Sequence, residues 1–356
     1  MMTYLSELSI TSTINHIRVN ARDILLQYVT TYKLSQAKLE KWVTFYLDQL
    51  EYDYEDGRLS AVEMIHSLVT AFSEKTNDSF ALLIFIKLAA RVVNEESKKC
   101  TKFVILALHN LFKCTSEKAH NELFSVTKDW LEADKEGPRL IAYELFAELV
   151  RGIPGLGAQQ LKVCLPILSK HFLALKIDEF SENVVLGILN AFTVLCQVQP
   201  VVFIETFVDL SKEHNLLVRL NDFLRCVLSR SVQLAASGFL GQLLASFRNE
   251  DIKAVHKKLK AIFVKEVGWI EFTYSMCFQL KGRVLTDETA EQIIKNLVFL
   301  SGQIASDEDY AGFVTRVANV CSKEVVEFSN ESTRVCLFAF WHSFFIQNLF
   351  SAQSHL

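Results

Sequence analysis

Glycine and proline are scarce in this sequence. The 356 residues contain 12 Gly and 4 Pro, under 5% of the chain, where average usage would give roughly 12%. Because β-sandwiches, barrels and doubly wound sheets need many turn residues, this scarcity disfavours them. Charged residues make up 22% and apolar residues 50%, a balance that excludes a disordered chain. The sequence therefore predicts a long, helix-rich protein with an extensive apolar core.

An excess of positive charge is also missing. Lys and Arg total 37 against 41 Asp and Glu, for a net charge of −4. Proteins that coat nucleic acid without sequence preference usually carry a basic excess, because their affinity rests on neutralising phosphates. Broad coating of RNA or DNA is therefore disfavoured, whereas a local basic patch is compatible with this charge balance.

Metal-binding and catalytic motifs are not found. The eight cysteines include no CxxC pair and no Cys–His pair at ligand spacing, which indicates free thiols in a reducing compartment, the cytosol or the nucleus. No phosphate-binding, dinucleotide-binding, zinc-protease or serine-hydrolase motif is present. The one glycine-rich stretch, Gly152–Gly157, lacks Lys and Ser and is interpreted as a loop between helices. We expect no enzyme, no cofactor and no small-molecule substrate.

Two uncharged stretches reach the length of a membrane span, Asn183–Ile204 and Val335–Leu356. Both contain polar residues in their interiors, which are costly in lipid. Buried helices of a large helical protein have the same composition, so we interpret both stretches as buried helices. The N-terminus shows no basic segment followed by an apolar one, and thus no secretory signal.

Several helix boundaries can be predicted from local sequence. The Ser60–Glu63 spacing is that of a capping box, and Thr286-Asp287-Glu288 places an N-cap candidate before two acids. Pro138 is expected in the first turn of a helix. The segment Asn215–Arg219 resembles the turn inside a HEAT repeat.

The helical patterns also repeat along the chain. Val232–Leu243 and Pro138–Leu149 share spaced small and apolar residues and resemble the second helix of a HEAT repeat. The late apolar positions of successive inner helices are separated by 39, 38, 46, 48, 57 and 45 residues, close to the HEAT and armadillo period of about 40–47. The 57-residue step predicts an insertion or irregular unit near Gly268–Arg283. These positions are Phe72, Leu111, Leu149, Leu195, Leu243, Leu300 and Phe345.

This spacing predicts an all-α fold, an α-solenoid of about seven degenerate HEAT/ARM-like helical repeats. No sharp linker divides the repeats, so we expect a single solenoid domain over residues 1–356. Residues 1–35 form an N-terminal helical segment that precedes the recognisable repeats.

One cationic cluster is a candidate contact for RNA or an acidic partner. Within it Lys253, Lys257 and Lys260 follow i, i+4, i+7 spacing and share one helix face, while Val255 and Leu259 face inward. A solvated outer face is the simpler interpretation, and a phosphate or acidic-partner contact is the functional one. A smaller candidate is Lys98-Lys99-Lys102. The residues of the main cluster are Arg248, Lys253, Lys257, Lys258 and Lys260.

The last expected helix is rich in aromatic residues and lacks the polar outer face that the end of a solenoid needs. Aromatic surface of this kind must be covered. We therefore expect a docking end, covered by a partner, by further chain of a longer protein or by the protein itself. Its residues are Phe338, Phe340, Trp341, Phe344 and Phe345.

Several runs in order resemble one protein family. The run Leu50–Ile65 (LEYDYEDGRLSAVEMI) has the family's pattern of Leu-x-Tyr, acidic residues, Gly-Arg and then Glu-Met-Ile. Supporting runs are Asn121–Leu131, Ile293–Phe299 and Arg334–Phe338. Together they resemble the C-terminal part of the small-subunit processome component 20 family, also called DRIM (down-regulated in metastasis), whose members are very large nucleolar HEAT-repeat proteins.

The resemblance implies a non-catalytic scaffold in small ribosomal subunit assembly that supports 18S rRNA processing. The implied partners are processome proteins and, with them, pre-rRNA or small nucleolar RNA, in the nucleus and nucleolus. No basic block resembling a nuclear signal is visible in the chain. One alternative is a cytoplasmic HEAT-repeat adaptor, similar to a transport receptor, that holds peptide segments. Another is a protein anchored in a membrane by Val335–Leu356.

Overall fold

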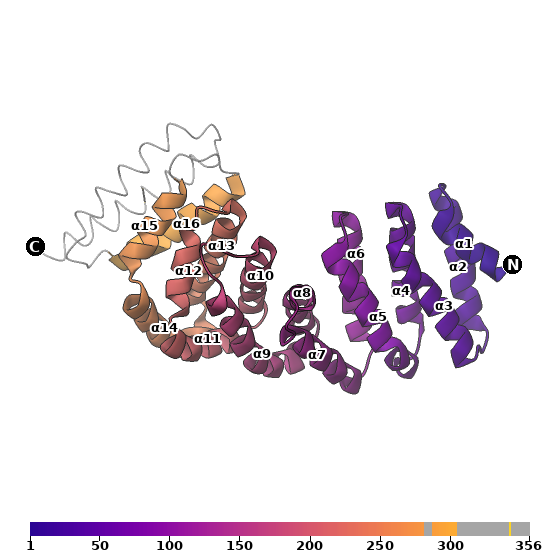
Figure 1. Ribbon diagram of the computed structural model, residues 1–356. Coiled ribbons are helices and arrows are strands. Elements are labelled where there is room, and N and C mark those ends of the chain that lie inside the picture. The colour runs from indigo at the N-terminus through magenta and orange to yellow at the C-terminus, as the bar shows by residue number, and fades with distance from the viewer. Residues whose placement is uncertain (281–286, 305–341, 343–356) are drawn as a thin grey trace, which may run out of the picture. The chain divides into compact units, whose positions relative to one another are not determined.

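In the computed structural model, the described residues are 1–280, 287–304 and 342, and all regular structure among them is helical. The chain divides into two compact units, residues 1–160 and 161–356. Figure 1 shows the successive helices of each unit packed side by side. The all-α, solenoid-type fold predicted from the sequence is confirmed. The prediction of a single domain over residues 1–356 stays a prediction. The same holds for the prediction that residues 1–35 are a helical segment that precedes the repeats.

The first unit is built from helices joined by short loops. Its helices are α1 (Met2–Thr11), α2 (Asn15–Thr31), α3 (Gln36–Asp48), the 3-10 turn η1 (Gln49–Glu51), α4 (Glu55–Ala71), α5 (Glu74–Asn94), α6 (Lys98–Lys113), α7 (Glu117–Leu131) and α8 (Glu136–Gly152), and α9 (Pro154–Ala174) follows into the second unit.

Helices α4, α6 and α8 form a row of contacting inner helices in the first unit. In α6, Val104, Ala107, Leu108 and Leu111 are all buried, and their i, i+3, i+4, i+7 spacing places them on one face. Serine residues cap the starts of three helices here: Ser73 accepts from the Thr76 amide, Ser97 from Cys100 and Ser116 from Ala119. The row of contacts is the stacking that the repeat spacing predicted.

The second unit adds a third helix to its repeats. Its helices are α10 (Glu182–Val198), α11 (Pro200–His214), α12 (Leu216–Leu224), α13 (Arg230–Ala245), the 3-10 turns η2 (Ser246–Arg248) and η3 (Glu250–Ile252), α14 (Lys253–Glu266), α15 (Trp269–Leu280) and α16 (Asp287–Ile304).

Two successive triplets, α11-α12-α13 and α14-α15-α16, stack so that equivalent helices touch: α11 contacts α14, α12 contacts α15 and α13 contacts α16. The extra short helices α12 and α15 explain the longer steps of 48 and 57 residues in the sequence. Gly268, with φ of 92°, separates α14 from α15, close to where an irregular unit was expected. Residues 281–286 lie outside the described residues.

Two local predictions are wrong. Ser60 and Glu63 do not form a capping box, because α4 begins five residues earlier at Glu55. Ser60 instead donates from Oγ to the Ser9 carbonyl at 2.6 Å, and Glu63 pairs with Arg22. The expected loop at residues 152–157 is reduced to Ile153, because α9 begins at Pro154 and includes the next two glycines.

Other local predictions are confirmed. Pro138 lies in the first turn of α8, and α16 begins at Asp287. Asn215 forms the turn between α11 and α12 in the left-handed conformation, with φ of 50°. Thr286, the expected cap of α16, lies outside the described residues.

Among the described helices, none combines the length and apolar character needed to cross a bilayer. The stretch Asn183–Ile204 is divided at Gln199 between α10 and α11. The second stretch, Val335–Leu356, lies outside the described residues except for exposed His342.

Candidate functional site

The lysines of the predicted cationic cluster lie on the outer face of α14 in the second unit. Lys253, Lys257, Lys258 and Lys260 are all exposed. The opposite face of α14 is buried, as expected from the sequence, through Val255, Leu259, Ile262 and Phe263. Lys265, which is not part of the predicted cluster, extends the exposed cationic face toward the end of the helix.

Acidic neighbours compensate part of this charge. Lys253 Nζ lies 3.0 Å from Glu250 Oε2. Asp209 on α11 receives a hydrogen bond from Lys212, which lowers the pKa of Asp209, and the charge of nearby Lys258 lowers this pKa further. Among the described residues, no carboxylate lies within ion-pair distance of Lys257. Among the four predicted lysines of α14, these two contacts leave Lys257 and Lys260 as the least compensated cations.

Arg248 is separated from these lysines by the fold. It ends the 3-10 turn η2, and its guanidinium carbon lies 5.9 Å from the centre of the Phe299 ring of α16. This position places Arg248 at the edge of a cavity of about 510 Å³ in the second unit. The five residues predicted as one cluster are therefore divided between a helix face and a cavity.

Three inner helices and the turn η2 line this cavity. Its walls come from α10, α13 and α16, and they carry two cations, several amides, glycines and aliphatic side chains. The lining residues are Thr193, Gln197, Gly238, Gly241, Gln242, Leu244, Ala245, Arg248, Gln292, Ile294, Lys295, Asn296, Val298 and Phe299. The sequence alone does not bring these amides together, because those on neighbouring helices are 45 to 54 residues apart and meet only when the helices stack.

Side-chain amides form bridges along the cavity. Gln197 Nε2 donates to Gln242 Oε1 at 3.2 Å, which joins α10 to α13. On α16, Gln292 Nε2 donates to Asn296 Oδ1 at 3.0 Å. Asn296 is itself buried and donates to the Ser237 carbonyl of α13 at 3.0 Å. The amides thus fix the three helices relative to one another while Gln197 remains exposed.

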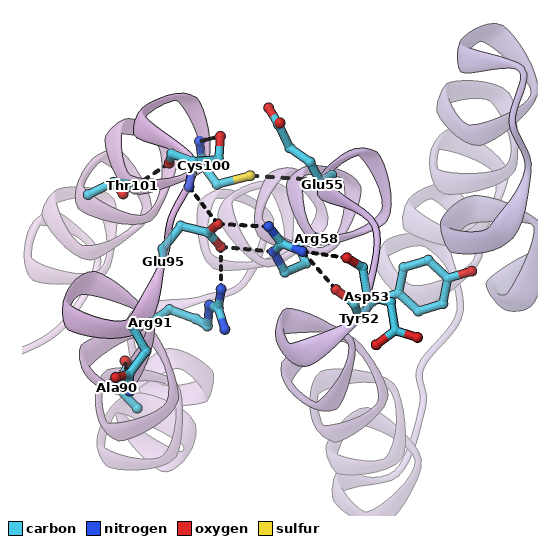
Figure 2. Close-up of polar contacts among 11 residues, drawn as sticks. Tyr52, Asp53, Glu55, Arg58, Ala90, Arg91, Glu95, Cys100 and Thr101 are labelled. Carbon is cyan, nitrogen blue, oxygen red and sulfur yellow. Dashed lines mark hydrogen bonds and ion pairs between the residues drawn. The ribbon is translucent and has the colours of Figure 1, made fainter.

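A second polar cluster lies inside the first unit and includes residues of the Leu50–Ile65 run. Figure 2 shows Arg58 of α4 directed at the Glu95 carboxylate, which Arg91 approaches from below in this view. Arg58 donates to both carboxylate oxygens of Glu95, at 2.8 and 2.9 Å, and Arg91 donates at 2.5 Å. Arg58 also donates to the carbonyls of Tyr52 and Asp53. The cluster ties η1, α4 and α5 together.

The Glu95 carboxylate is held in its charged form. Only 1% of its side chain is exposed. Burial raises the pKa of Glu95, but hydrogen bonds from Arg58, the Ser97 amide and Arg91 outweigh this effect, and the pKa is lowered to about 2. Because both oxygens of the Glu95 carboxylate accept hydrogen bonds from neighbours, the cluster stabilises the fold and is not an acid–base centre.

Cysteine chemistry is suppressed where the thiols are buried. Burial raises the pKa of the Cys100 thiol, next to the Glu95 cluster, and raises the pKa of Cys196 to about 12. Such thiols are poor nucleophiles at neutral pH.

Among the described residues, no three His, Cys, Asp or Glu side chains are placed to hold a metal ion. The predicted docking-end residues, from Phe338 to Phe345, lie outside the described residues.

Comparison with known proteins identifies the family. The model of the family described as small subunit processome component 20 homolog, C-terminal, matches residues 139–353, more than half of the chain. The chain belongs to this family. The resemblance inferred from Leu50–Ile65 and the supporting runs is therefore confirmed for the C-terminal region of processome component 20.

Two curated relatives from yeasts share one name. The U3 small nucleolar RNA-associated protein 20 of Schizosaccharomyces pombe is 21% identical over 332 residues, which cover 90% of this chain and 13% of that protein. The protein of the same name in Saccharomyces cerevisiae is 23% identical over 127 residues, 36% of this chain and 5% of that protein. The chain thus spans a small fraction of the length of these processome component 20 relatives.

Solved helical-repeat structures are also similar. A chain from a structural study of the cadherin–beta-catenin interaction is 14% identical, with a TM-score of 0.45, over 98% of this chain and 64% of that chain. A designed armadillo repeat protein is 15% identical, with a TM-score of 0.38, over 72% of this chain and 98% of that chain.

Proposed function

We propose that this chain is a non-catalytic helical-repeat scaffold of the small-subunit processome that supports 18S pre-rRNA processing. The observation that carries the proposal is the match of residues 139–353 to the C-terminal region of processome component 20. Stacked helices in both units suit this role, since repeat proteins present extended surfaces to partners. The buried and fully paired cluster at Glu95 is consistent with this role, because its polar groups stabilise the fold.

The proposed location is the nucleus, and within it the nucleolus, because the two yeast relatives are named as U3 small nucleolar RNA-associated proteins. The proposed partners are processome proteins and pre-rRNA or small nucleolar RNA. No small-molecule substrate or cofactor is part of this proposal.

Co-precipitation tests the scaffold function. The tagged chain, expressed in its own cells, should sediment with pre-ribosomes in a sucrose gradient and recover U3 small nucleolar RNA above the level recovered by the tag alone. A chain found only in light cytosolic fractions, without this RNA, would instead favour the adaptor alternative.

We further propose that the exposed face of α14 contacts the phosphates of RNA in this assembly. Its support is the row of exposed lysines, of which Lys257 and Lys260 are the least compensated. Lysines on one helix face act as point charges toward a phosphate backbone and carry no sequence preference.

Charge reversal tests the α14 contact. The double variant Lys257→Glu/Lys260→Glu should bind a pre-rRNA fragment less tightly and should lower the slope of log affinity against log salt by about 1–2. The matched control is Lys170→Glu/Lys176→Glu, which makes the same change of net charge at exposed positions of the same unit. Equal affinities and slopes for the two variants would leave α14 as a solvated face.

A further inference from the structure

The cavity beside Arg248 is an open groove across three inner helices. On α13, Gly238, Gly241, Gln242 and Ala245 line it, and their i, i+3, i+4, i+7 spacing is that of one helix face. Residues 292, 295, 296 and 299 of α16 line it with the same spacing. At Gly238 an added Cβ would meet no atom within 4 Å, so the absence of a side chain there keeps the groove open.

The charged residues that line the groove are all cationic. Arg248 and Lys295 line it, and no Asp or Glu is among the lining residues. Arg248 is exposed and makes no ion pair within the described part of the chain, while its contact with Phe299 holds the guanidinium at the rim. A preorganised guanidinium of this kind matches a carboxylate on a ligand.

The amides of the groove match the groups of a peptide backbone. A side-chain amide carries both donors and acceptors. Gln197 and Gln242 use one donor and one acceptor on each other, and the remaining NH₂ group of Gln242 donates to none of the described residues. Such groups can pair with the N–H and C=O of an extended chain lying across the helices. Half-buried Val298 and exposed Ala245 supply an apolar part that suits an aliphatic side chain.

The groove is less suited to single-stranded RNA. Base recognition of that type needs exposed aromatic faces on which bases stack, together with a row of cations. Phe299 is covered by Arg248 and stacks on Phe247, with ring centres 5.5 Å apart. Two cations and an occupied aromatic face therefore favour a peptide over RNA.

We propose that this groove binds an extended acidic segment of a partner protein, with a carboxylate at Arg248 and an aliphatic side chain beside Val298. The inference rests on the scaffold function and names the partner chemistry of one of its surfaces. Its test uses the purified chain alone, so a negative result here does not bear on the predicted sedimentation of the chain with pre-ribosomes.

A display selection tests the proposal without assuming the partner. The full chain is used to select from a library of random twelve-residue peptides, and the affinities of the enriched peptides are measured by fluorescence anisotropy. Enriched peptides should carry Asp or Glu next to Leu, Ile or Val. Arg248→Glu should weaken their binding by about tenfold, and Gly238→Trp, which fills the groove, should abolish it.

Two controls separate loss of binding from loss of fold. Gly137→Trp places the same ring at another glycine with open space around it, and Lys176→Glu reverses another exposed charge; both should keep affinity within about twofold. Circular dichroism should show Gly238→Trp to be as helical as the wild type.

Three results would overturn the proposal. Enriched peptides that bind Gly238→Trp and Arg248→Glu as well as the wild type would place the site elsewhere. Binding of oligouridine that Gly238→Trp abolishes would make the groove an RNA site. Failure to enrich any peptide, with residues 305–356 gaining amide exchange in Gly238→Trp, would assign the groove to the protein's own chain.

Discussion

At the scale of single residues, Glu95 shows how much of the chain's polar chemistry serves the fold. Its carboxylate accepts from Arg58, Arg91 and the Ser97 amide while only 1% of the side chain is exposed. Arg58 and Arg91 are themselves only 14% and 16% exposed. Removal of the carboxylate would therefore leave two poorly solvated cations without their partner.

We expect Glu95→Gln to lower the free energy of unfolding by about 2–4 kcal/mol, because breaking a buried ion pair leaves an uncompensated charge. Urea denaturation followed by circular dichroism measures this change. Exposed Glu96→Gln, one residue along, is the matched control and should shift stability by less than about 0.5 kcal/mol. Equal effects of the two substitutions would contradict the role given to Glu95.

The same carboxylate predicts a pH dependence. Its pKa is lowered from the ordinary 4.5 to about 2 in the folded protein, so the stabilisation is complete above the unfolded-state pKa and is lost as the pH falls toward the folded-state value. Between about pH 5 and pH 2 the wild type should lose about 2–3 kcal/mol more than Glu95→Gln. Parallel stability curves for the two proteins over this window would show that the carboxylate is not held in its charged form.

Gly57 is the residue of the Leu50–Ile65 run that permits the closest packing. A Cβ at this position would overlap the ring of Tyr52 and approach the Ile10 carbonyl to 3.1 Å. Gly57→Ala should therefore destabilise the protein by about 1–2 kcal/mol, although alanine favours helices. Gly155→Ala, in the first turn of α9 with open space around it, should be neutral or stabilising by up to about 1 kcal/mol.

The double variant Tyr52→Ala/Gly57→Ala separates the steric effect from others. If overlap with Tyr52 causes the loss, alanine at position 57 should cost much less in the Tyr52→Ala background. Additive losses in thermal melting would place the cause elsewhere.

Predictions for single residues were limited because several polar side chains have their hydrogen-bond partners in distant parts of the chain. Ser60 has the spacing of a cap, yet its hydroxyl donates to Ser9, 51 residues away. The Gly57-Arg58 pair, which precedes the predicted cap, already lies in the first turn of α4. Arg58's partner Glu95 could not be predicted, because nothing local to Arg58 marks a carboxylate 37 residues away.

At the scale of elements, the junction between α11 and α12 depends on one left-handed residue. Asn215 has φ of 50° and ψ of 49°, a conformation that costs other side chains about 1–2 kcal/mol and glycine nothing. Asn215→Ala should destabilise the protein by about 1 kcal/mol relative to Asn215→Gly. Thermal melting of both variants measures the difference, and equal melting temperatures would show that the left-handed turn is not under steric constraint.

The inner helices could be predicted from their spacing because one apolar row recurs every 38 to 48 residues up to Leu243. The third helices α12 and α15 could not be predicted in this way. Helix α12 has nine residues, and a carboxylate of another repeat, Glu266, accepts from its Leu217 amide at 2.8 Å. A short helix stabilised from outside its own sequence leaves little periodic signal.

At the scale of the whole molecule, the scarcity of glycine and proline is explained by helices joined through short loops. The apolar content follows from stacking, since helices such as α6 and α13 are covered by neighbouring helices on more than one side. The candidate surfaces were harder to predict. Arg248 is close to Lys253 in sequence, but the fold assigns it to the groove lined by α10, α13 and α16, because the turn η3 lies between Arg248 and α14.

Depletion of the protein in its own cells, followed by blotting for 18S rRNA precursors, tests the central claim most directly. The scaffold account predicts that unprocessed 18S precursors accumulate while precursors of the large subunit do not, and that re-expression of the protein restores processing. Normal levels of 18S precursors after full depletion would contradict the account.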